Sequence, residues 1–540
     1  MKIALVQMNA IIGDFQNNID SIKKHTHQAY TQGAQLVIFP ELCVCGYPPK
    51  DLALYPSFQK ENDHALQVLS ETLPPDIAVL VGSITSSIHG LQNTMSCIFQ
   101  GKIYFQQSKT LLPSYDVFNE PRIFTPAQTF HSFTLGKTKI IVAICEDVWR
   151  DTEIPGNRYT KNPLEELTKL SANVLIAASA SPFYVNKPKL RENIIKKIAL
   201  KYHIPVIFVN TTGAHDSLIF DGYSFAVNAQ GEIVTRLPGF KEYCAYTEIP
   251  SRKKKLLVLH QNKYADICDA LCMGINDFVH KNNCSRVHFG LSGGIDSAVV
   301  AVLAQKALGA KNVHAVLMPS IYSSDTSIQD AQKLVASLCI RSSYIPIHTH
   351  FTAFLSSFNL SLHAQGITVE NIQARIRGIL LMAIANQESS LLLNTGNKSE
   401  LAVGYCTLYG DMTGALSVIG DLFKTEVYEL AAYLNTKEPY IPQSILDKTP
   451  SAELRPHQKD QDTLPAYDVL DSILAHHLIQ KQCAKQIIKK GFPPQTVSKV
   501  LHLVKKSEFK RFQSAPILKI SPLTFGDGRD MPIAGKGIPI

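Results

Sequence analysis

The most restrictive feature of this sequence is a strand–loop–helix segment in its second half. The apolar run VHFG (287–290) passes into the loop LSGGIDS and then into AVVAVLAQKALG, which has the length and composition of a helix. Beyond it, the runs VHAVLMP, SYIPI and SLLLNTG alternate with helical patterns over Ser327–Leu338 and Glu370–Asn386. Strands and helices that alternate in this way form a parallel sheet with helices on both faces. The second half is therefore predicted to be α/β, with a doubly wound parallel sheet.

The loop that follows the first of these strands has the composition of an anion-binding loop. Its two glycines let several backbone N–H groups face one anion, and the N-terminus of the next helix adds positive potential. Ser292 and Ser297 can donate hydrogen bonds, and Asp296 can hold a Mg²⁺ ion that binds phosphate. The loop lacks the lysine of the G-x-x-x-x-G-K-[ST] motif, which typically serves transfer of a terminal phosphoryl group. A lysine-free loop instead suits a departing pyrophosphate.

Residues 1–250 show a different pattern and are predicted to form a separate domain. Asn17–Gln32 and Lys189–Tyr202 have the apolar spacing of helices, and the strand candidates are KIALVQM, AQLVIFP, IAVLVGS, KIIVAIC, NVLIAAS and IPVIFVN. Nearly continuous apolar strands favour an α/β fold with a sandwich core, because both faces of each sheet are covered. The charged run IPSRKKK is typical of a linker. The predicted boundaries are 1–250, a linker at 251–265, and 266–540.

Composition argues against several classes of protein. The formal charge of +8 is mild for 540 residues, and no basic stripe interleaved with aromatic residues favours nucleic acid. No apolar run reaches the roughly 18 residues that cross a bilayer. The opening MKIALVQMNA passes directly into a strand pattern, so no leader is expected. The eleven scattered cysteines form no four-ligand zinc pattern, so reduced thiols in the cytoplasm are expected.

Three polar residues in the first half lie at strand ends or in distinctive segments. Glu41 follows LVIFP, Lys109 lies in QQSKTLLPSYDVFNEPRIF, and Cys145 follows the apolar strand KIIVAI at an expected sharp turn. Singly, each has a simpler explanation: a surface carboxylate, a solvated lysine or a core cysteine. Together, a carboxylate, an ammonium and a thiol supply a base, an oxyanion donor and a nucleophile.

These motifs resemble known families. Ser292–Ser297 resembles the pyrophosphate loop of the N-type ATP pyrophosphatases, and Glu41, Lys109 and Cys145 resemble the triad of the nitrilase superfamily. The segments VENIQARIRG, LLLNTGNKSELAVGY and DKTPSAELRPHQKDQDTLPAYDVLD are similar to those of NAD⁺ synthetases. Over nearly its whole length the chain resembles the glutamine-dependent NAD⁺ synthetases.

This resemblance implies a fold and a reaction. The fold is an N-terminal nitrilase-like α-β-β-α sandwich followed by the doubly wound synthetase sheet. The reaction is ATP-dependent amidation of deamido-NAD to NAD⁺ through a deamido-NAD adenylate, with ammonia from L-glutamine and with AMP, pyrophosphate and glutamate as products. Mg²⁺ is the implied cofactor, and a homo-oligomer without nucleic-acid or membrane partners is expected. Ammonia is expected to pass between the sites without release to water, which would protonate it.

The resemblance also implies residue roles. Cys145 would attack the carboxamide, Glu41 would accept and return the proton, and Lys109 would stabilise the oxyanion and lower the thiol pKa. The implied glutamine-binding residues are Tyr115, Ser181 and Lys187. The implied ATP-binding residues are Gly290, Leu291, Ser292, Gly293, Gly294, Ile295, Asp296, Ser297 and Thr395, with Lys398 nearby. Deamido-NAD would contact Asn371, Glu400 and Lys510, and the metal would be held by Asp296 and Glu400. His457 departs from the family pattern, which more often has glycine there.

Two alternatives stay open. One is another glutamine-dependent ligase, of the GMP or asparagine synthetase type, which pairs a similar loop with a different glutaminase fold. The segment NTGNKSE and the order Glu41, Lys109, Cys145 argue against it. The other is a first domain that is only a scaffold for oligomerisation, which the presence of all three triad residues makes less favourable.

Overall fold

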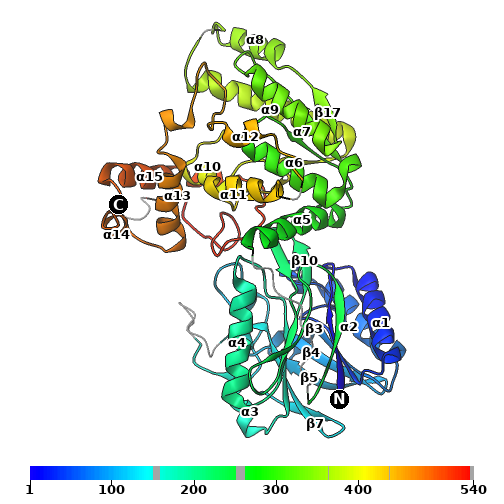
Figure 1. Ribbon diagram of the computed structural model, residues 1–540. Helices are drawn as coiled ribbons and strands as arrows, with labels where there is room; N and C mark the ends of the chain where they lie inside the picture. Colours follow the sequence, from blue (N-terminus) through cyan, green and yellow to red (C-terminus); the bar gives the residue numbers. More distant parts are fainter. Residues whose placement is uncertain (150–158, 251–261, 363, 437, 536–540) are drawn as a thin grey trace. The chain divides into compact units, whose positions relative to one another are not determined.

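The chain is described from a computed structural model that covers residues 1–149, 159–250, 262–362, 364–436 and 438–535. It divides into two compact units, unit 1 over Met1–Gln261 and unit 2 over Asn262–Ile540. Figure 1 shows the strands of unit 1 between helices on either side. Among the described helices, none has the length and apolar character needed to cross a membrane.

Unit 1 is built on two sheets, each six-stranded within the described residues. The first sheet has the order β14 (Tyr243–Glu248), β1 (Lys2–Gln7), β2 (Leu36–Ile38), β3 (Ala78–Ser87), β4 (Gly90–Phe99), β5 (Lys102–Ser108). The second has the order β13 (Ile233–Arg236), β12 (Phe225–Val227), β9 (Val206–Asn210), β8 (Val174–Ser179), β7 (Thr138–Ile144), β6 (Ser132–Leu135). β10 (Thr212–His215) and β11 (Leu218–Asp221) form a separate hairpin.

The alternation of side chains along the strands explains the layers of unit 1. Leu5 of the first sheet and Val142 of the second belong to one core between the sheets. Their neighbours point the other way: Val6 packs in the core under helices α1 (Phe15–Thr31) and α2 (Pro56–Thr72), and Ile141 in the core under α4 (Lys187–Tyr202). Because both faces of each sheet are buried, the central strands are apolar almost throughout. The predicted α-β-β-α sandwich is confirmed.

The central strands of unit 1 were predicted from the sequence, whereas its peripheral strands were not. Each of the six predicted runs contains a strand, and both predicted helices form, as α1 and α4. The unpredicted strands are β4, β5, β6, the hairpin β10–β11 and β12–β14. Most of them contain polar residues, such as Asn93, Gln106 and Thr235, so they lack the continuous apolar signal of the centre. Short 3₁₀ turns lie at Lys50–Leu54, Glu120–Arg122, Cys145–Val148 and Pro163–Glu165, and α3 at Glu166–Lys169.

Unit 2 contains a parallel sheet that is five-stranded over the described residues, in the order β17-β16-β15-β18-β19. The strands are β15 (Val287–Gly290), β16 (Val313–Leu317), β17 (Arg341–Tyr344), β18 (Leu391–Asn394) and β19 (Leu416–Ser417). The chain moves outward from β15 through β16 to β17 and then returns to place β18 on the other side of β15. The order therefore reverses between β15 and β18, where open parallel sheets form a crevice at the carboxyl ends of their strands. The predicted doubly wound sheet is confirmed.

Helices connect and flank this sheet. They are α5 (Lys263–Lys281), α6 (Ile295–Leu308), α7 (Asp325–Leu338), α8 (His348–Ser357), α9 (Ile367–Glu388), α10 (Lys398–Val403), α11 (Lys424–Leu434), α12 (Gln443–Asp447), α13 (Tyr467–Leu474), α14 (Ala484–Ile488), α15 (Pro494–Lys506) and α16 (Glu508–Arg511), with a π-helical turn at Ala475–Ile479. Residues 251–261 of the predicted linker lie outside the described residues. Residues 263–265 belong to α5, so this helix begins before the predicted boundary at 266, because Asn262 caps it by accepting from Tyr264 N.

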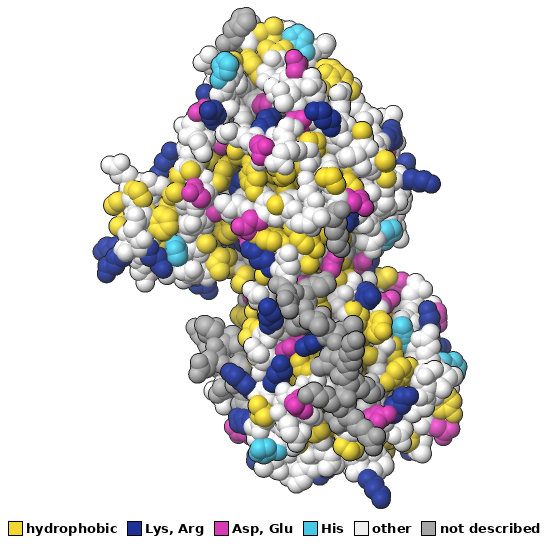
Figure 2. Space-filling model, in the orientation of Figure 1, with side chains coloured by type: hydrophobic (Ala, Val, Ile, Leu, Met, Phe, Trp, Pro, Cys, Tyr) yellow, Lys and Arg dark blue, Asp and Glu magenta, His cyan; other side chains and the backbone are white. Residues whose placement is uncertain are grey.

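The charged side chains of the surface are mixed. On the face shown in Figure 2, the Lys and Arg side chains of the described residues are dispersed among Asp and Glu and do not gather into a stripe.

Candidate active sites

In unit 1 the fold brings the ends of three strands together. Glu41 lies three residues after β2, Lys109 directly follows β5, and Cys145 directly follows β7. The ammonium of Lys109 donates to Glu41 Oε1 over 2.8 Å, and both side chains are completely buried. Glu41 Oε2 accepts from Ala180 N over 2.7 Å, which ties the segment after β2 to the end of β8 in the second sheet. Cys145 interacts electrostatically with both Glu41 and Lys109.

The cysteine occupies a sharp turn, as the sequence predicted. Its φ is +41°, a left-handed value that costs about 1–3 kcal/mol for a side chain other than glycine. The buried carboxylate of Asp147 holds the turn, since it accepts from Ile144 N over 3.0 Å. The same carboxylate accepts from Thr110 N over 3.0 Å and Leu111 N over 2.8 Å. Asp147 thus ties the residue before Cys145 to the segment after Lys109.

The ammonium of Lys109 lowers the pKa of Cys145, as expected, but the net shift of that pKa is upward. Burial raises the pKa of Cys145 well above its ordinary value, the negative charge of Glu41 raises it further, and Lys109 only partly opposes them. The sequence showed the lysine but not the depth at which the thiol is buried, with 4% of the residue exposed. Burial therefore favours the neutral thiol form of Cys145 at rest.

A second buried carboxylate, Glu120, lies in this site. Glu120 Oε1 accepts from Lys109 Nζ over 2.7 Å and from the hydroxyl of Tyr47 over 2.9 Å. Burial raises the pKa of Glu120 to about 7, with Lys109 opposing the shift and Glu41 adding to it. The only sequence signal was that Glu120 lies in the same polar segment as Lys109. Lys109 is therefore held between two buried carboxylates.

The raised thiol pKa predicts how Cys145 reacts with iodoacetamide. Because the thiolate is the reactive form, the alkylation rate should rise about tenfold per pH unit from pH 7 to pH 9. Glu41→Gln removes a charge that raises the pKa of Cys145, so the variant should be alkylated faster at each pH. Mass spectrometry of the peptide that contains Cys145 measures both rates. A rate that is already constant between pH 7 and pH 8 would show that the resting thiol is ionised.

The three residues expected to bind glutamine lie around this triad. The hydroxyl of Tyr115 donates to Glu146, the neighbour of Cys145, over 3.0 Å. Ser181 follows Ala180, whose N–H binds Glu41. Lys187 begins α4, interacts electrostatically with Cys145, and is only 8% exposed. All three therefore lie next to residues that form or contact the triad.

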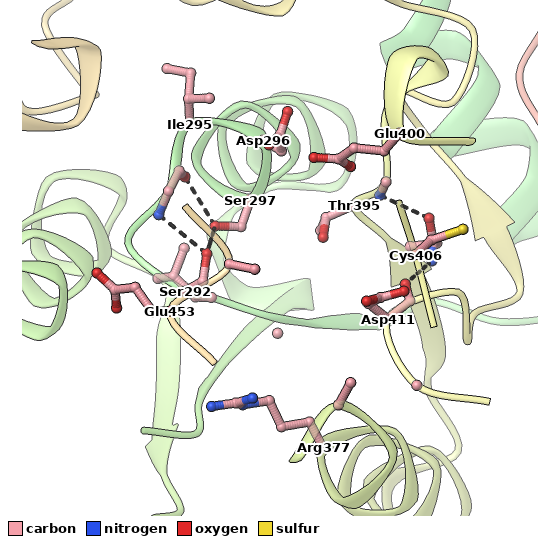
Figure 3. Close-up of a pocket in the computed structure, with 18 of the residues that line it drawn as sticks. Ser292, Ile295, Asp296, Ser297, Arg377, Thr395, Glu400, Cys406, Asp411 and Glu453 are labelled. Atoms are coloured by element: carbon pink, nitrogen blue, oxygen red, sulfur yellow. Dashed lines mark hydrogen bonds between the residues drawn. The ribbon is translucent and has the colours of Figure 1, made fainter. Parts of the chain in front are cut away.

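Unit 2 holds a cavity of about 320 Å³ at the crevice between β15 and β18 (Figure 3). Nine of the residues predicted to bind ATP, metal or dinucleotide line it: Gly290, Leu291, Ser292, Gly294, Ile295, Asp296, Ser297, Thr395 and Glu400. They come from the segments around the starts of α6 and α10, which follow β15 and β18. The cavity is thus at the position where open parallel sheets bind ligands.

The loop of the SGGIDS motif is held in a turned conformation by its own side chains. Ser297 Oγ donates to Gly294 O over 3.1 Å, and Gly294 N donates to Ser292 Oγ over 3.2 Å. Gly293 has φ +77°, and a Cβ placed on it would lie 2.2 Å from Ser327 O. Gly293 itself does not line the cavity, but its missing side chain lets the loop pack against the first turn of α7.

Two carboxylates face each other on one side of the cavity. Asp296 accepts from Asn397 Nδ2 over 3.1 Å, and Glu400 forms a capping box with the same asparagine at the start of α10 (Figure 3). Burial raises the pKa of Glu400 to about 8, and the charge of Asp296 contributes to the shift. A divalent cation would relieve this repulsion, and one or two carboxylates with substrate phosphates are the usual ligands of Mg²⁺. The described residues contain no cluster of three or more His, Cys, Asp or Glu side chains suited to a metal, so the fit is to this pair alone.

A lysine that no sequence motif singled out lies between these carboxylates. Lys424, at the start of α11, makes an ion pair with Asp296, and its Nζ lies 3.7 Å from Glu400 Oε1. Lys398, which is expected to lie near ATP, does not line this cavity. Its ammonium instead donates to Asp421 over 2.8 Å and to Ser521 over 2.8 Å in the interior. Both lysines begin helices, and only the packing decides which of them faces the crevice.

Two further expected residues also lie outside the cavity lining. Asn371 accepts from Thr407 Oγ1 over 2.8 Å, and Lys510 donates to Gly404 O over 2.8 Å and to Cys406 O over 2.7 Å. Both therefore contact the segment 404–407, of which Tyr405 and Cys406 line the cavity. A dinucleotide role for Asn371 and Lys510 stays a prediction.

The cavity also contains charged residues without a predicted role. Arg377 of α9 lies across the cavity from Asp296 and donates to Met318 O over 3.0 Å (Figure 3). Burial lowers the pKa of this guanidinium to about 10, and the negative charges of Glu453 and Asp411 partly oppose this shift. Glu453 accepts from Ser327 Oγ over 2.6 Å and from Lys448 Nζ over 2.9 Å, which fastens the long polar loop to α7. Arg377 lies in the segment VENIQARIRG and Glu453 in the segment that begins DKTPSAELRP, but neither residue was predicted to have a role.

The departure at His457 has a structural consequence. This exposed residue has φ +54°, a left-handed conformation that glycine adopts without strain. His457→Gly is expected to stabilise unit 2 by about 0.5–1 kcal/mol. This value is the left-handed strain that is relieved, minus the additional conformational entropy that glycine loses on folding. Thermal unfolding measures the change. Lys459→Gly is the matched control and should destabilise, because Lys459 in the same loop has φ −131°. A lower unfolding temperature for His457→Gly would contradict the expectation.

Family comparisons agree with this arrangement of sites. The carbon-nitrogen hydrolase model matches residues 2–254, and the NAD synthase model matches residues 267–514. A curated relative, the glutamine-dependent NAD(+) synthetase of Synechocystis sp., is 46% identical, with 98% of each chain covered. The enzyme of the same name from Acinetobacter baylyi is 39% identical, and the match covers 100% of this chain and 99% of the relative.

Solved structures show the same likeness. The glutamine-dependent NAD⁺ synthetase from Acinetobacter baumannii in complex with ADP has a TM-score of 0.78 at 35% identity, with 98% of both chains covered. The glutamine-dependent NAD(+) synthetase from Cytophaga hutchinsonii has a TM-score of 0.84 over 99% of this chain and 98% of its own. At 19% identity, the second comparison concerns the fold alone.

Proposed function

The chain belongs to the family of glutamine-dependent NAD⁺ synthetases, and from this premise we propose how its two sites divide the reaction. The enzyme amidates deamido-NAD to NAD⁺ with ATP, through an adenylate, and takes the nitrogen from L-glutamine. We assign release of ammonia to residues 1–250 and amidation to residues 266–540. The observation that carries the assignment is that each unit holds its own set of reactive groups where strands end.

In unit 1, Cys145 attacks the carboxamide carbon of glutamine while Glu41 accepts the thiol proton. A thioester forms, the proton passes to the departing nitrogen, and ammonia leaves. Water, activated by Glu41, then releases glutamate. Lys109 stabilises the oxyanion in both steps, and its two contacts with buried carboxylates support this role because they fix its ammonium in place.

The neutral resting thiol supports a concerted first step. A thiol with a raised pKa needs a base close to it, and the buried carboxylate of Glu41 next to Lys109 supplies one. Lys187 would bind the α-carboxylate of glutamine, and Tyr115 and Ser181 would help to place the rest of the substrate.

In unit 2, the backbone N–H groups and hydroxyls of Ser292–Ser297 would bind the ATP phosphates, and the helix dipole of α6 would favour the anion. The carboxylate of deamido-NAD is a poor electrophile because its charge repels nucleophiles. Its adenylate lacks that carboxylate charge and carries AMP as a leaving group, so ammonia can displace it. Thr395, on the loop after β18, lines the same cavity and would contact ATP.

Asp296 and Glu400 would hold Mg²⁺, which supplies positive charge to the phosphates when bound. Lys424 is then left as the nearby cation for a phosphate oxygen.

Cytoplasmic location and a homo-oligomer complete the proposal and are expected from the sequence. The match of both units to the family disfavours a GMP- or asparagine-type ligase, and the contacts of the triad disfavour a scaffold role for unit 1.

A reconstituted reaction tests the proposal. The protein is mixed with Mg²⁺, ATP, glutamine and deamido-NAD, and the formation of NAD⁺ and pyrophosphate is followed. Nicotinate and xanthylate compounds serve as rival acceptors and should give no amide product. Omission of Mg²⁺ with a chelator present should stop NAD⁺ formation. An amide product from xanthylate in place of deamido-NAD would overturn the assignment.

A further inference from the structure

A buried ion pair lies beneath the predicted glutamine site and has no part in the mechanism above. Arg191 of α4 donates through Nη2 to Asp221 Oδ2, at the end of β11. Their side chains are 1% and 0% exposed. Burying two charges is unfavourable unless other hydrogen bonds satisfy them, so their remaining contacts indicate what the pair does.

Those contacts converge on the main chain of Ser181. Asp221 Oδ1 accepts from Asn210 Nδ2 over 3.1 Å, and Asn210 Oδ1 accepts from Ser181 N over 2.8 Å. Ser181 O accepts from Arg191 Nη1 over 3.3 Å and from Asn210 Nδ2 over 3.3 Å. Both polar groups of the Ser181 main chain are therefore held by this cluster of Arg191, Asn210 and Asp221.

Lys187 lies four residues before Arg191 on α4, so the two side chains share one face of the helix. The Nζ of Lys187 lies 5.0 Å from the ring centre of Tyr184 and 5.7 Å from that of Trp149. Within the described part of the chain, this ammonium makes no hydrogen bond or ion pair. A buried ammonium with aromatic neighbours and no protein anion in contact suits the carboxylate of a ligand.

We propose that Arg191 and Asp221 are positioning residues for glutamine: they fix the Ser181 main chain and neutralise each other, which leaves Lys187 as the cation for the ligand's α-carboxylate. The inference rests on the proposed function, because that function assigns Ser181 and Lys187 to glutamine. Without Asp221, Arg191 would be an uncompensated cation beside Lys187 and would compete with it for the carboxylate.

The electrostatics of Lys187 make the proposal measurable. Burial lowers the pKa of Lys187 to about 8, and the charge of Arg191 lowers it further, whereas Cys145, Asp116 and Asp221 raise it. Glu146 also faces Lys187 electrostatically. Lys187 is therefore protonated below pH 8 and loses its charge above it. Removal of the negative charge of Asp221 shifts this loss to a lower pH.

The first test is Asp221→Asn, with KM for glutamine measured from pH 6.5 to pH 9. The pH at which KM begins to rise should fall from about 8 by about one unit, which makes KM about fivefold higher at pH 8 and about tenfold higher at pH 9. The kcat with glutamine at pH 6.5 and NAD⁺ formation from ammonia should be unchanged. A parental KM profile in a folded Asp221→Asn enzyme would overturn the proposal.

The double variant Arg191→Gln/Asp221→Asn separates charge from geometry, and it also serves if Asp221→Asn does not fold. It removes Arg191, whose charge lowers the pKa of Lys187, together with Asp221. The pH at which KM begins to rise should therefore return to about 8 or above. KM should stay severalfold raised at every pH, because Ser181 O loses the donor Arg191. A double variant with parental KM throughout would contradict the positioning role.

Asp216→Asn is the matched control for the Asp221 variants. Asp216 lies in the turn of the same hairpin and makes an exposed ion pair with Lys50.

Lys187→Met distinguishes failure of the positioning role from failure of the proposed function. If it leaves KM for glutamine unchanged, the assignment of Lys187 in the proposed function is wrong. If it raises KM while both Asp221 variants keep the parental profile, the proposed function stands and the role of the ion pair is wrong.

Discussion

Cys145→Ala is expected to lose glutamine-supported NAD⁺ formation by roughly 10⁴-fold or more, the scale seen when a catalytic nucleophile is removed. The same variant should keep NAD⁺ formation from added ammonium salts, because we assign amidation to the other of the two units. The comparison is made with saturating ATP and deamido-NAD, first with glutamine and then with ammonium at pH 8 or above. The two rates together separate loss of the nucleophile from loss of folding.

Cys97→Ala is the matched control for this variant. Cys97 is buried in the same core between the sheets as Cys145, so both substitutions remove one sulfur atom from that core. Cys97→Ala should keep both activities, with a modest loss of thermal stability. Glutamine use by Cys145→Ala at the parental rate would show that another group is the nucleophile.

Gly293→Ala is expected to lower kcat/KM for ATP by roughly 10²–10³-fold, the scale of one preorganised hydrogen-bond donor. The new Cβ would lie 2.2 Å from Ser327 O, so either the SGGIDS loop or the first turn of α7 must move. Because both segments contribute to the cavity lining, the loss should appear with glutamine and with ammonium alike. Steady-state NAD⁺ formation with each nitrogen donor measures it.

Gly309→Ala is the control that separates the effect of the steric clash at Gly293 from the effect of backbone strain. Gly309 also has φ +77°, but a Cβ there meets nothing within 4 Å. Both variants should lose stability from the unfavourable φ, by about 1–3 kcal/mol. Only Gly293→Ala should lose ATP use. Equal kcat/KM values for the two variants would show that the close approach to Ser327 does not matter for binding.

Much of the fold followed from the sequence because buried strands carry a strong signal. Strands such as β7 and β8 are covered on both faces, so most residues in them are apolar. The peripheral strands β4 and β5 are partly exposed and partly polar, and no local pattern separated them from loops. Residues 514–535 form no helix or strand, because proline and glycine interrupt any period there.

The placing of site residues was predictable where a strand end fixes them and less so elsewhere. Glu41, Lys109 and Cys145 lie close to strand ends, and the sheets bring those ends together. Lys398 and Lys424 both begin helices, and the sequence favoured the first, whereas the structure places the second beside Asp296. The spacing of apolar residues along a helix does not show which lysine pairs with a buried carboxylate and which one faces a cavity.

The sequence by itself determined the sheet class, the turn at Cys145, the anion-binding loop and the types of reactive group. These are local properties, because they depend on the spacing of apolar residues, the positions of glycines and the chemistry of a few neighbouring residues. Only the tertiary structure decided the upward shift of the Cys145 pKa, the lysine that faces the cavity of unit 2 and the ion pair next to Ser181. Burial and the distance between charges set these properties, and both depend on residues far apart in the chain.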